Sequence, residues 1–239
     1  MDEGLKNILD EVAKKRAALM QTQSEKNGST RQAAGIDLDA ERKARANLES
    51  AGIYRRFQGI TFDSIERHGL PPSESIRQNY GKAKEYAANL AENQKNGYGL
   101  ILSGTYGTMK TTIAVAVLRK WLDDGHNGLL VPMCSLIDNL YTMRALNKEE
   151  WARYEARIRS TPLLVLDDLG GENTDQSWVL SKVDSIITER YNKMLPIIIT
   201  TNLSKDELMG TYSGRIVDRL RNTSKYIAFN AASQRRVRV

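Results

Sequence analysis

The chain has 239 residues, of which 41% are hydrophobic and 27% are charged, and its formal net charge is +6. This composition is that of an ordinary globular protein, with enough residues for one full α/β domain and a smaller appendage. Cys134 is the single cysteine, which excludes an intramolecular disulfide and any cysteine-rich metal site. No apolar run approaches the length that spans a bilayer, and the acidic N-terminus resembles neither a signal peptide nor a transit peptide. We therefore expect a cytoplasmic protein in a reducing compartment.

The first predicted elements are helical. Residues 3–22 form an amphipathic pattern, with Leu5, Ile8, Leu9, Val12 and Leu19 at three- and four-residue steps. The polar stretch SEKNGSTRQAAG then predicts a linker. A second helix is predicted over residues 39–51, and the prolines ahead of Ser73 and Glu74 predict the start of a third that ends near Lys95.

From Tyr98 onward, short apolar strands alternate with helices. The predicted strands are YGLILSG, NGLLVPM, PLLVLDDLGG, LPIIITTN and KYIAF, and helices are predicted between them, with one or two over residues 135–158. Such alternation indicates a mostly parallel sheet that is covered by helices on both faces. We expect three parts: residues 1–35 as a partner-binding helix and linker, residues 36–95 as a helical lead-in, and residues 96–239 as the α/β core.

The segment ILSGTYGTMKTT lies between a predicted strand and a predicted helix, as a phosphate-binding loop does. It matches the pattern G-x-x-x-x-G-K-S/T except that Met109 stands where the second glycine is usual. The predicted nucleotide-binding residues are Gly104, Thr105, Tyr106, Gly107, Thr108, Met109, Lys110, Thr111 and Thr112. Lys110 is expected to reach the β- and γ-phosphates of ATP, and Thr111 to hold Mg²⁺. A glycine-containing turn that happens to precede a lysine is the alternative.

Two later strands end in polar residues that suit the same site. Asp167 and Asp168 end the strand LLVLDD, where ligands of open α/β sheets bind. Asp167 suits Mg²⁺, and Asp168 suits polarisation of the attacking water. Asn202 ends the next strand, where it can orient water or touch the γ-phosphate. A helix-capping aspartate and a turn-forming asparagine are the alternatives.

The C-terminal part of the chain is basic. Residues 205–239 contain eight Lys/Arg and three Asp/Glu, which suits an anionic partner or simply a solvated surface. Within it, GRIVDRLRNTS puts Arg215 and Arg219 on one helix face. Planar cations there suit a phosphate reached from elsewhere, including a neighbouring subunit's nucleotide, or ion pairs with Asp218 or Asp206.

These motifs, in this order, resemble those of the AAA+ ATPases, and among them the bacterial helicase loaders of the DnaC type and the related IstB transposition ATPases. The similarity covers roughly residues 40–239, including AGIYRRFQGITFDS as a lead-in. It implies a P-loop AAA+ core with a five-stranded parallel sheet, preceded by a small helical region, and an ATPase that uses ATP and Mg²⁺. By position, Asn202 resembles the family's sensor residue, Arg219 its arginine finger donated in trans, and Arg235 its second sensor, although Gln234 stands where an aromatic is usual.

The resemblance also implies partners: a hexameric replicative DNA helicase gripped by the N-terminal region, single-stranded DNA bound inside a self-assembled multimer, and a bacterial or phage source. Tyr141, Arg144 and Trp178 fall near segments that bind DNA in the family, and core or surface packing is their alternative role. Residues 3–22 could equally dock on their own domain.

Three functions remain open from the sequence. The first is a helicase loader whose ATP hydrolysis controls release, the second a transposition helper on duplex DNA, and the third a nucleotide-bound scaffold that scarcely hydrolyses ATP. Met109 departs from the family pattern, and we expect it to crowd or shift the loop and to lower the affinity for nucleotide or the rate of turnover.

Overall fold

The structure is a computed structural model, and it describes residues 38–170, 177–231 and 233. Contacts divide the chain into two compact units, Met1–Ala46 and Asn47–Val239. The predicted helix over residues 3–22 and the linker after it lie outside the described residues, as does Arg235. Everything described below, except the first residues of α2, belongs to the second unit.

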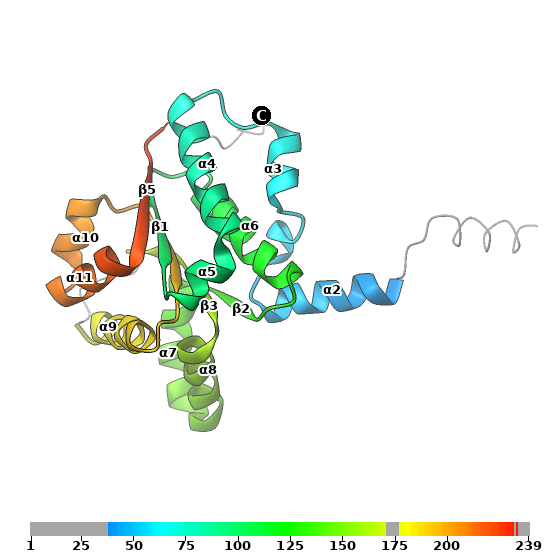
Figure 1. Ribbon diagram of the computed structural model, residues 1–239. Coiled ribbons are helices and arrows are strands. Elements are labelled where there is room, and N and C mark those ends of the chain that lie inside the picture. The colour runs from blue at the N-terminus through cyan, green and yellow to red at the C-terminus, as the bar shows by residue number, and fades with distance from the viewer. Residues whose placement is uncertain (1–37, 171–176, 232, 234–239) are drawn as a thin grey trace, which may run out of the picture. The chain divides into compact units, whose positions relative to one another are not determined.

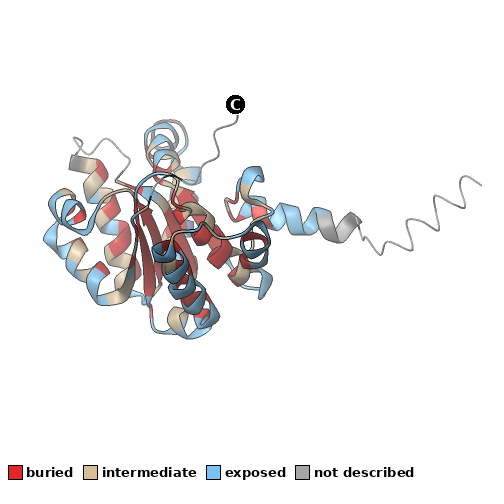
Figure 2. Cartoon of the chain, turned by 90° about the horizontal axis from the view of Figure 1, so that it is seen from above, coloured by how far each residue is buried: buried red, intermediate tan, exposed pale blue. Residues whose placement is uncertain are grey.

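The core of the second unit is a five-stranded parallel sheet with the strand order β2-β3-β4-β1-β5. Its strands are β1 (Gly99–Gly104), β2 (Gly128–Pro132), β3 (Leu163–Leu169), β4 (Ile197–Thr201) and β5 (Ser224–Phe229). Nearly every residue of β1, β2 and β4 is buried, as the red strands at the centre of Figure 2 show. Burial on both faces explains why these strands are continuous apolar runs in the sequence.

Helices cover both faces of this sheet (Figure 1). Those of the second unit are η1 (Arg55–Phe57), α3 (Phe62–His68), α4 (Glu74–Ala88), α5 (Leu90–Lys95), α6 (Lys110–Asp123), α7 (Met133–Leu146), α8 (Lys148–Ser160), α9 (Ser177–Asn192), α10 (Lys205–Thr211) and α11 (Gly214–Thr223). The helix α2 (Leu38–Ser50) begins in the first unit and ends in the second. Side chains of α3 to α6 pack on one face with Leu100 and Leu102 of β1. Side chains of α7 to α11 pack on the other face with Ile101, because successive residues of a strand point to opposite sides.

The predicted parallel sheet between helices is confirmed, and the helix boundaries differ from prediction in two places. The helix predicted from Glu74 to Lys95 ends at Ala88, where the Asn89 side chain donates to the carbonyl of Glu85 at 3.1 Å, and α5 follows. The helices α3 and α10 were not predicted. Both are seven residues long, which is too short for a clear apolar period, and both begin with a capping box, at Thr61 and at Ser204.

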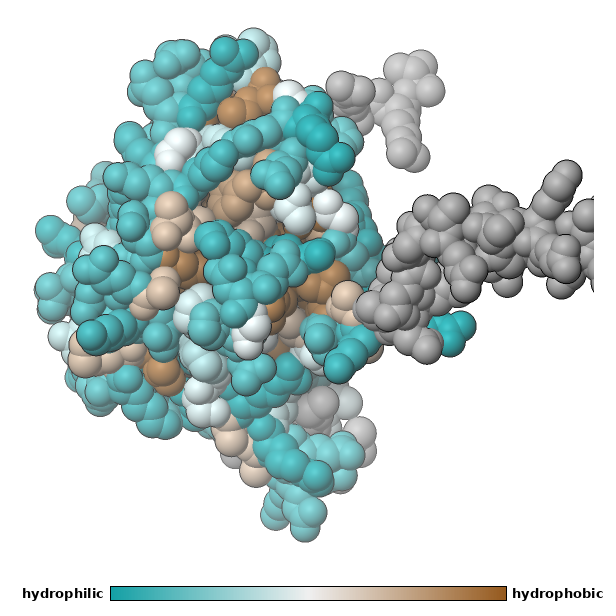
Figure 3. Space-filling view, turned by 45° about the vertical axis from the view of Figure 1, so that its right-hand side comes forward, coloured by the Kyte–Doolittle hydropathy of each residue, from teal (hydrophilic) through white to brown (hydrophobic). Residues whose placement is uncertain are grey.

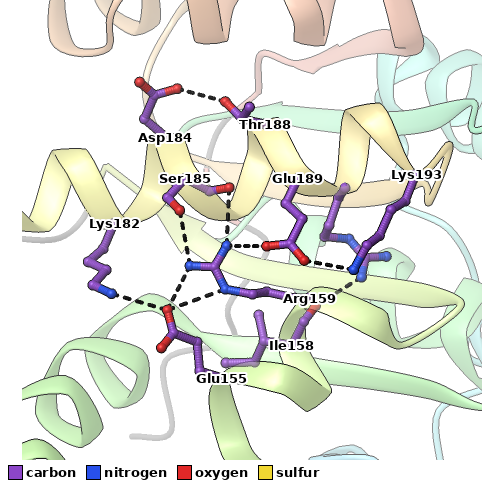
Figure 4. A network of polar contacts seen from close by, with 10 residues as sticks. Glu155, Ile158, Arg159, Lys182, Asp184, Ser185, Thr188, Glu189 and Lys193 are labelled. Carbon is purple, nitrogen blue, oxygen red and sulfur yellow. Dashed lines mark hydrogen bonds and ion pairs between the residues drawn. The ribbon is translucent and has the colours of Figure 1, made fainter. Parts of the chain in front are cut away.

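Charged side chains join the helices α8 and α9 (Figure 4). Arg159 pairs with Glu155 and with Glu189 at 2.6 Å each, and Lys182 and Lys193 extend the network to the same two glutamates. Because Arg159 is largely buried and bridges two helices, the network fixes their relative position more firmly than isolated surface pairs would.

Arg190 of α9 is fully buried and has a different role. Its guanidinium donates to the backbone carbonyls of Ile158, Thr161 and Pro196, each at 2.9 Å, so it joins the end of α8 to the starts of β3 and β4. Burial lowers the pKa of Arg190 to about 9, which leaves the side chain charged at neutral pH.

On the face drawn in Figure 3, hydrophilic residues cover most of the surface, and hydrophobic ones show in separate areas between them. Within the described ranges, no helix is long and apolar enough to cross a membrane.

We predict that Arg190→Lys lowers the free energy of unfolding by about 2–4 kcal/mol. The three carbonyls are reached from two separate nitrogens of the guanidinium, and the shorter lysine has a single nitrogen that cannot stand at both places. Each carbonyl left unpaired costs about 1–3 kcal/mol. Urea denaturation measures this change. Arg153→Lys is the matched control, since that arginine of α8 is exposed and its ion pair with Glu149 is long, at 3.9 Å. This substitution should change the free energy of unfolding by less than about 0.5 kcal/mol. Equal effects of the two substitutions would contradict the role assigned to Arg190.

Candidate functional site: a phosphate-binding pocket at the carboxyl edge of the sheet

The predicted phosphate loop connects β1, which ends at Gly104, to α6, which begins at Lys110. Two of its glycines are required by space and backbone conformation. Gly104 has φ +144°, and a Cβ there would lie 2.2 Å from the carbonyl oxygen of Phe229 in β5. Gly107 has φ +77°, and a Cβ there would lie 2.1 Å from Oγ of Ser233. The loop is thus closely packed against the chain that follows β5, and Thr105 Oγ1 donates to the carbonyl of Ala231 at 2.8 Å.

Lys110 is buried at the first position of α6. Its Nζ donates to the carbonyl oxygens of Gly104 and Thr105 at 2.8 Å each and to Oδ1 of Asn202 at 2.9 Å. Three oxygens therefore surround the ammonium, which offsets the cost of burying the charge. The ammonium is held by the loop beside the N-terminus of α6, where backbone N–H groups can donate hydrogen bonds to phosphate oxygens.

The acidic pair lies at the end of β3. Asp167 Oδ1 accepts hydrogen bonds from the hydroxyls of Thr111, at 2.9 Å, and Thr200, at 2.6 Å. Burial raises the pKa of the Asp167 carboxyl above its usual value, and so does the neighbouring charge of Asp168, whereas the two hydroxyls and Lys110 act in the opposite direction. Asp168 has a left-handed backbone with φ 62°, which turns it away from the regular strand.

Asn202 follows β4 and connects the lysine to the acidic pair. Its Oδ1 accepts from Lys110, and its Nδ2 donates to Oδ1 of Asp168 at 2.5 Å. Since β4 lies between β3 and β1 in the sheet, a residue at its end is within reach of both. Asn202 therefore joins Lys110 to Asp168, in addition to the bond between Thr111 and Asp167.

These side chains line one cavity of about 470 Å³. The predicted residues around it are Tyr106, Gly107, Thr108, Met109, Lys110, Thr111, Thr112, Asp167, Asp168 and Asn202, whereas Gly104 and Thr105 contribute carbonyls to Lys110 from behind it. Five further residues line the cavity without having been predicted: Tyr54, Arg56, Phe57, Pro132 and Thr200. The first three belong to the segment AGIYRRFQ. This segment has no motif whose spacing would assign a role to single residues, so the sequence did not reveal them.

Met109 has the left-handed conformation that glycine usually supplies, with φ 70° and ψ 7°. Its half-buried side chain packs against the core cluster of α4 and α6 and also lines the cavity. A non-glycine residue in this conformation costs about 1–2 kcal/mol. The departure from the usual pattern therefore leaves the loop in a glycine-like path and places strain and a side chain at its end.

The donor set fits a magnesium ion that shares its ligands with phosphate. Within the described ranges, no group of three or more His, Cys, Asp or Glu side chains could hold a metal on its own. The oxygens of Thr111 and Asp167, 2.9 Å apart, instead offer the hydroxyl and carboxylate that Mg²⁺ uses when phosphates and water complete its shell.

The remaining predicted residues lie away from this cavity or outside the described part. Arg219 of α11 pairs with Asp184 at 3.8 Å, donates to Thr188 Oγ1, and lies 5.5 Å from the centre of the Tyr191 ring, all on α9. Arg215, one turn earlier, is exposed. The exposed ring of Tyr141 meets that of Trp178 edge to face at 4.7 Å, and Arg144 lies on α7 with a side chain outside the described part.

Comparisons with known proteins agree with this geometry. Residues 6–238 match the model of the family described as IstB-like ATP binding protein. The replicative helicase loader DnaC of Escherichia coli is 24% identical over 212 residues, which are 87% of this chain and 82% of that protein. The replicative helicase loader DnaI of Bacillus subtilis is 26% identical over 181 residues, which are 74% of this chain; the match spans little more than half of DnaI, 56% of its length.

Solved structures give the same fold. The crystal structure of the DnaC helicase loader matches with a TM-score of 0.65 and 25% identity, over 74% of this chain and 99% of that one. The replication initiator DnaA bound to AMPPCP and single-stranded DNA matches with a TM-score of 0.58 and 18% identity, over 72% of this chain and 51% of that one. The sheet is thus that of a P-loop AAA+ ATPase, as its strand order, phosphate loop and acidic pair also indicate. With a family match over nearly its whole length, the chain belongs to the IstB-like ATP binding proteins.

Proposed function

We propose that the chain is an ATP-dependent loader of a replicative DNA helicase. In this proposal residues 1–35 bind a hexameric helicase, the AAA+ core assembles into a multimer that binds single-stranded DNA, and ATP hydrolysis controls release. The similarity to the loaders DnaC and DnaI supports the partner and the cellular process.

The observation that supports ATP chemistry most directly is the contact between residues from the phosphate loop and from the ends of β3 and β4. Lys110, Asp168 and Asn202 come from segments far apart in the sequence and are joined by hydrogen bonds of 2.9 and 2.5 Å. If the glycine-containing turn before Lys110 were a chance resemblance, an acidic pair and an amide would not be expected in the same cavity.

Each residue has a role in phosphoryl transfer to water. Lys110 binds the β- and γ-phosphate oxygens, and backbone N–H groups of residues 106–111 surround the other phosphate oxygens. Thr111 and Asp167 would hold Mg²⁺, which neutralises charge on the phosphates when bound. Asp168 polarises the attacking water. Asn202 links the orientation of the Asp168 carboxylate to that of Lys110, which contacts the γ-phosphate.

Arg219 and Arg235 are proposed to act in the assembled multimer, Arg219 on a neighbour's nucleotide and Arg235 on its own. Arg219 lies outside the cavity of its own chain, and its guanidinium is held against α9 by Asp184 and Thr188. Arg235 comes two residues after Ser233, which packs on Gly107 of the phosphate loop. The position of Arg219 outside its own cavity suits an ATPase that is complete only as a multimer.

The DNA-binding surface is proposed to include Tyr141, Trp178 and Arg144. The aromatic pair lies where α7 meets α9, with 47% of Tyr141 exposed. An exposed ring that rests on a second ring is a suitable platform for an unpaired base.

A transposition helper on duplex DNA is the second candidate, because the matching family is described by its IstB-like members. Preference for duplex over single-stranded DNA would favour it. A scaffold with little hydrolysis is the third candidate, which the strained Met109 favours and which unstimulated, negligible turnover would support.

We predict that Lys110→Ala reduces Mg-ATP binding at least about tenfold, because the site loses its only buried ammonium, while Asp168→Asn retains binding and reduces hydrolysis about a hundredfold. Calorimetry measures the first effect and phosphate release the second. Lys193→Ala, which removes an exposed lysine directly after α9, serves as control and should change neither. Hydrolysis at the wild-type rate in both site variants would contradict the assigned pocket.

We predict that Met109→Gly unfolds at a free energy about 1 kcal/mol higher than Met109→Ala, because only alanine retains the strain of the left-handed backbone. Met109→Gly should also bind Mg-ATP about tenfold more tightly than the wild type, since a side chain leaves the cavity wall. Denaturation and calorimetry test the two effects. Identical affinities in all three proteins would show that Met109 does not limit binding.

We predict that deletion of residues 1–35 abolishes a complex with the replicative helicase of the same cell, detected by pull-down with purified proteins, and leaves Mg-ATP affinity within about threefold of the full chain. An unchanged complex would count against the loader. A lost complex together with lost ATP binding would indicate that the deletion unfolds the core.

A further inference from the structure

Thr200 of β4 makes two hydrogen bonds that reach both members of the acidic pair. It is 1% exposed, donates from Oγ1 to Asp167 Oδ1 at 2.6 Å, and accepts from the backbone N–H of Asp168 at 2.9 Å. The direction of these bonds is fixed, because an amide nitrogen can only donate, so the single hydroxyl proton is directed at the carboxylate.

Thr200 is also the residue opposite an irregularity in β3. Leu166 pairs with Ile199, and the next pair is Leu169 with Thr201, so Asp167 and Asp168 both stand opposite Thr200. In such a bulge the extra residue loses its regular partner in the ladder. The Thr200 hydroxyl supplies that partner to Asp168, whose φ of 62° is unfavourable for a residue with a side chain.

The two donors to Asp167 differ in what they can do when nucleotide arrives. Thr111 lines the cavity from the first turn of α6 and offers its own hydroxyl oxygen to a metal. Thr200 also borders the cavity, but it lies on a central strand of the sheet, is almost fully buried, and donates its one hydroxyl proton to Asp167. It therefore keeps Asp167 in one orientation whichever way the Thr111 hydroxyl turns.

We propose that Thr200 is a positioning residue for the acidic pair: its hydroxyl sets the orientation of the Asp167 carboxylate toward Mg²⁺ and stabilises the bulged backbone that points Asp168 at water. The proposal rests on the proposed ATPase function and extends it to a residue that acts through the two aspartates. It ascribes metal dependence of nucleotide binding, rather than nucleotide binding itself, to one hydroxyl.

The test uses Thr200→Val, which removes the hydroxyl at nearly constant shape, with Thr200→Ser, which keeps it, and Thr200→Cys, which replaces it with a weak donor. Calorimetry with a slowly hydrolysed ATP analogue is carried out in Mg²⁺ and in EDTA. We expect the valine variant to lose about tenfold in affinity with Mg²⁺ and less than about twofold in EDTA, as for other residues that orient a metal ligand. Serine should restore the Mg²⁺ effect, cysteine should restore part of it, and kcat/KM for Mg-ATP should follow the same order.

Thr201→Val is the matched control. Thr201 is equally buried and loses two hydrogen bonds when mutated, to the carbonyl of Leu169 at 2.6 Å and from the N–H of Leu203 at 3.1 Å, neither of which involves an aspartate side chain. It should lower the melting temperature as Thr200→Val does and keep the wild-type ratio of affinities with and without Mg²⁺.

Three results would overturn the inference. The first is an unchanged ratio in Thr200→Val, and the second is an equal loss in Thr201→Val, which would reveal a general packing effect. The third is a failure of serine to restore the ratio in a folded protein. If the wild type binds no nucleotide under either condition, the proposed ATPase function fails and the inference fails with it. If Thr200→Val does not fold, the serine and cysteine variants decide the outcome by the same ratio.

Discussion

The position of β4 between β3 and β1 is the constraint on which the site depends. All five strands are parallel, so their carboxyl ends meet at one edge of the sheet, and β4 brings Thr200 and Asn202 to that edge between the lysine and the aspartates. The single amide of Asn202 could not reach both Lys110 and Asp168 if more than one strand lay between β1 and β3. The chemistry of the pocket is therefore a consequence of strand order.

Polar groups in this pocket stabilise one another at the cost of backbone strain. Lys110 is buried and Asp167 is half-buried, and each is surrounded by oxygens or hydroxyls that offset its desolvation. Within the described ranges, three non-glycine residues have a positive φ, and two of them, Met109 and Asp168, line this cavity. Strain of this kind persists where the surrounding structure fixes it, and functional sites are where it concentrates.

Three arginines with different roles belong to α9 or pair with its side chains. Arg190 is part of α9 and is buried among carbonyls, Arg159 of α8 pairs with Glu189, and Arg219 of α11 pairs with Asp184. The first two fix α9 to the sheet and to α8. The third depends on α9 for its orientation, so the proposed action of Arg219 on a neighbouring subunit rests on the same scaffold as the stability of the fold.

The sequence by itself determined the elements with a strong signal. Continuous apolar runs bounded by glycine or proline identified four of the five strands, because strands buried on both faces contain few polar residues. The fifth, β5, was identified from the short run KYIAF and is only partly buried. Spacing identified the phosphate loop, and position at strand ends identified Asp167, Asp168 and Asn202. Short helices such as α3 and α10 escaped prediction, since seven residues hold only two turns of the period.

Only the tertiary structure decided which side chains meet. Strand order cannot be read from a chain in which β1, β3 and β4 are separated by helices, and the contacts of Asn202 with Lys110 and Asp168 follow from that order alone. The roles of Thr200 and Arg190 were equally invisible, because a threonine in a strand and an arginine in a helix have no local pattern that marks a buried hydrogen bond. Local sequence fixes backbone preference and burial pattern, whereas hydrogen bonds between distant residues exist only once the sheet has formed.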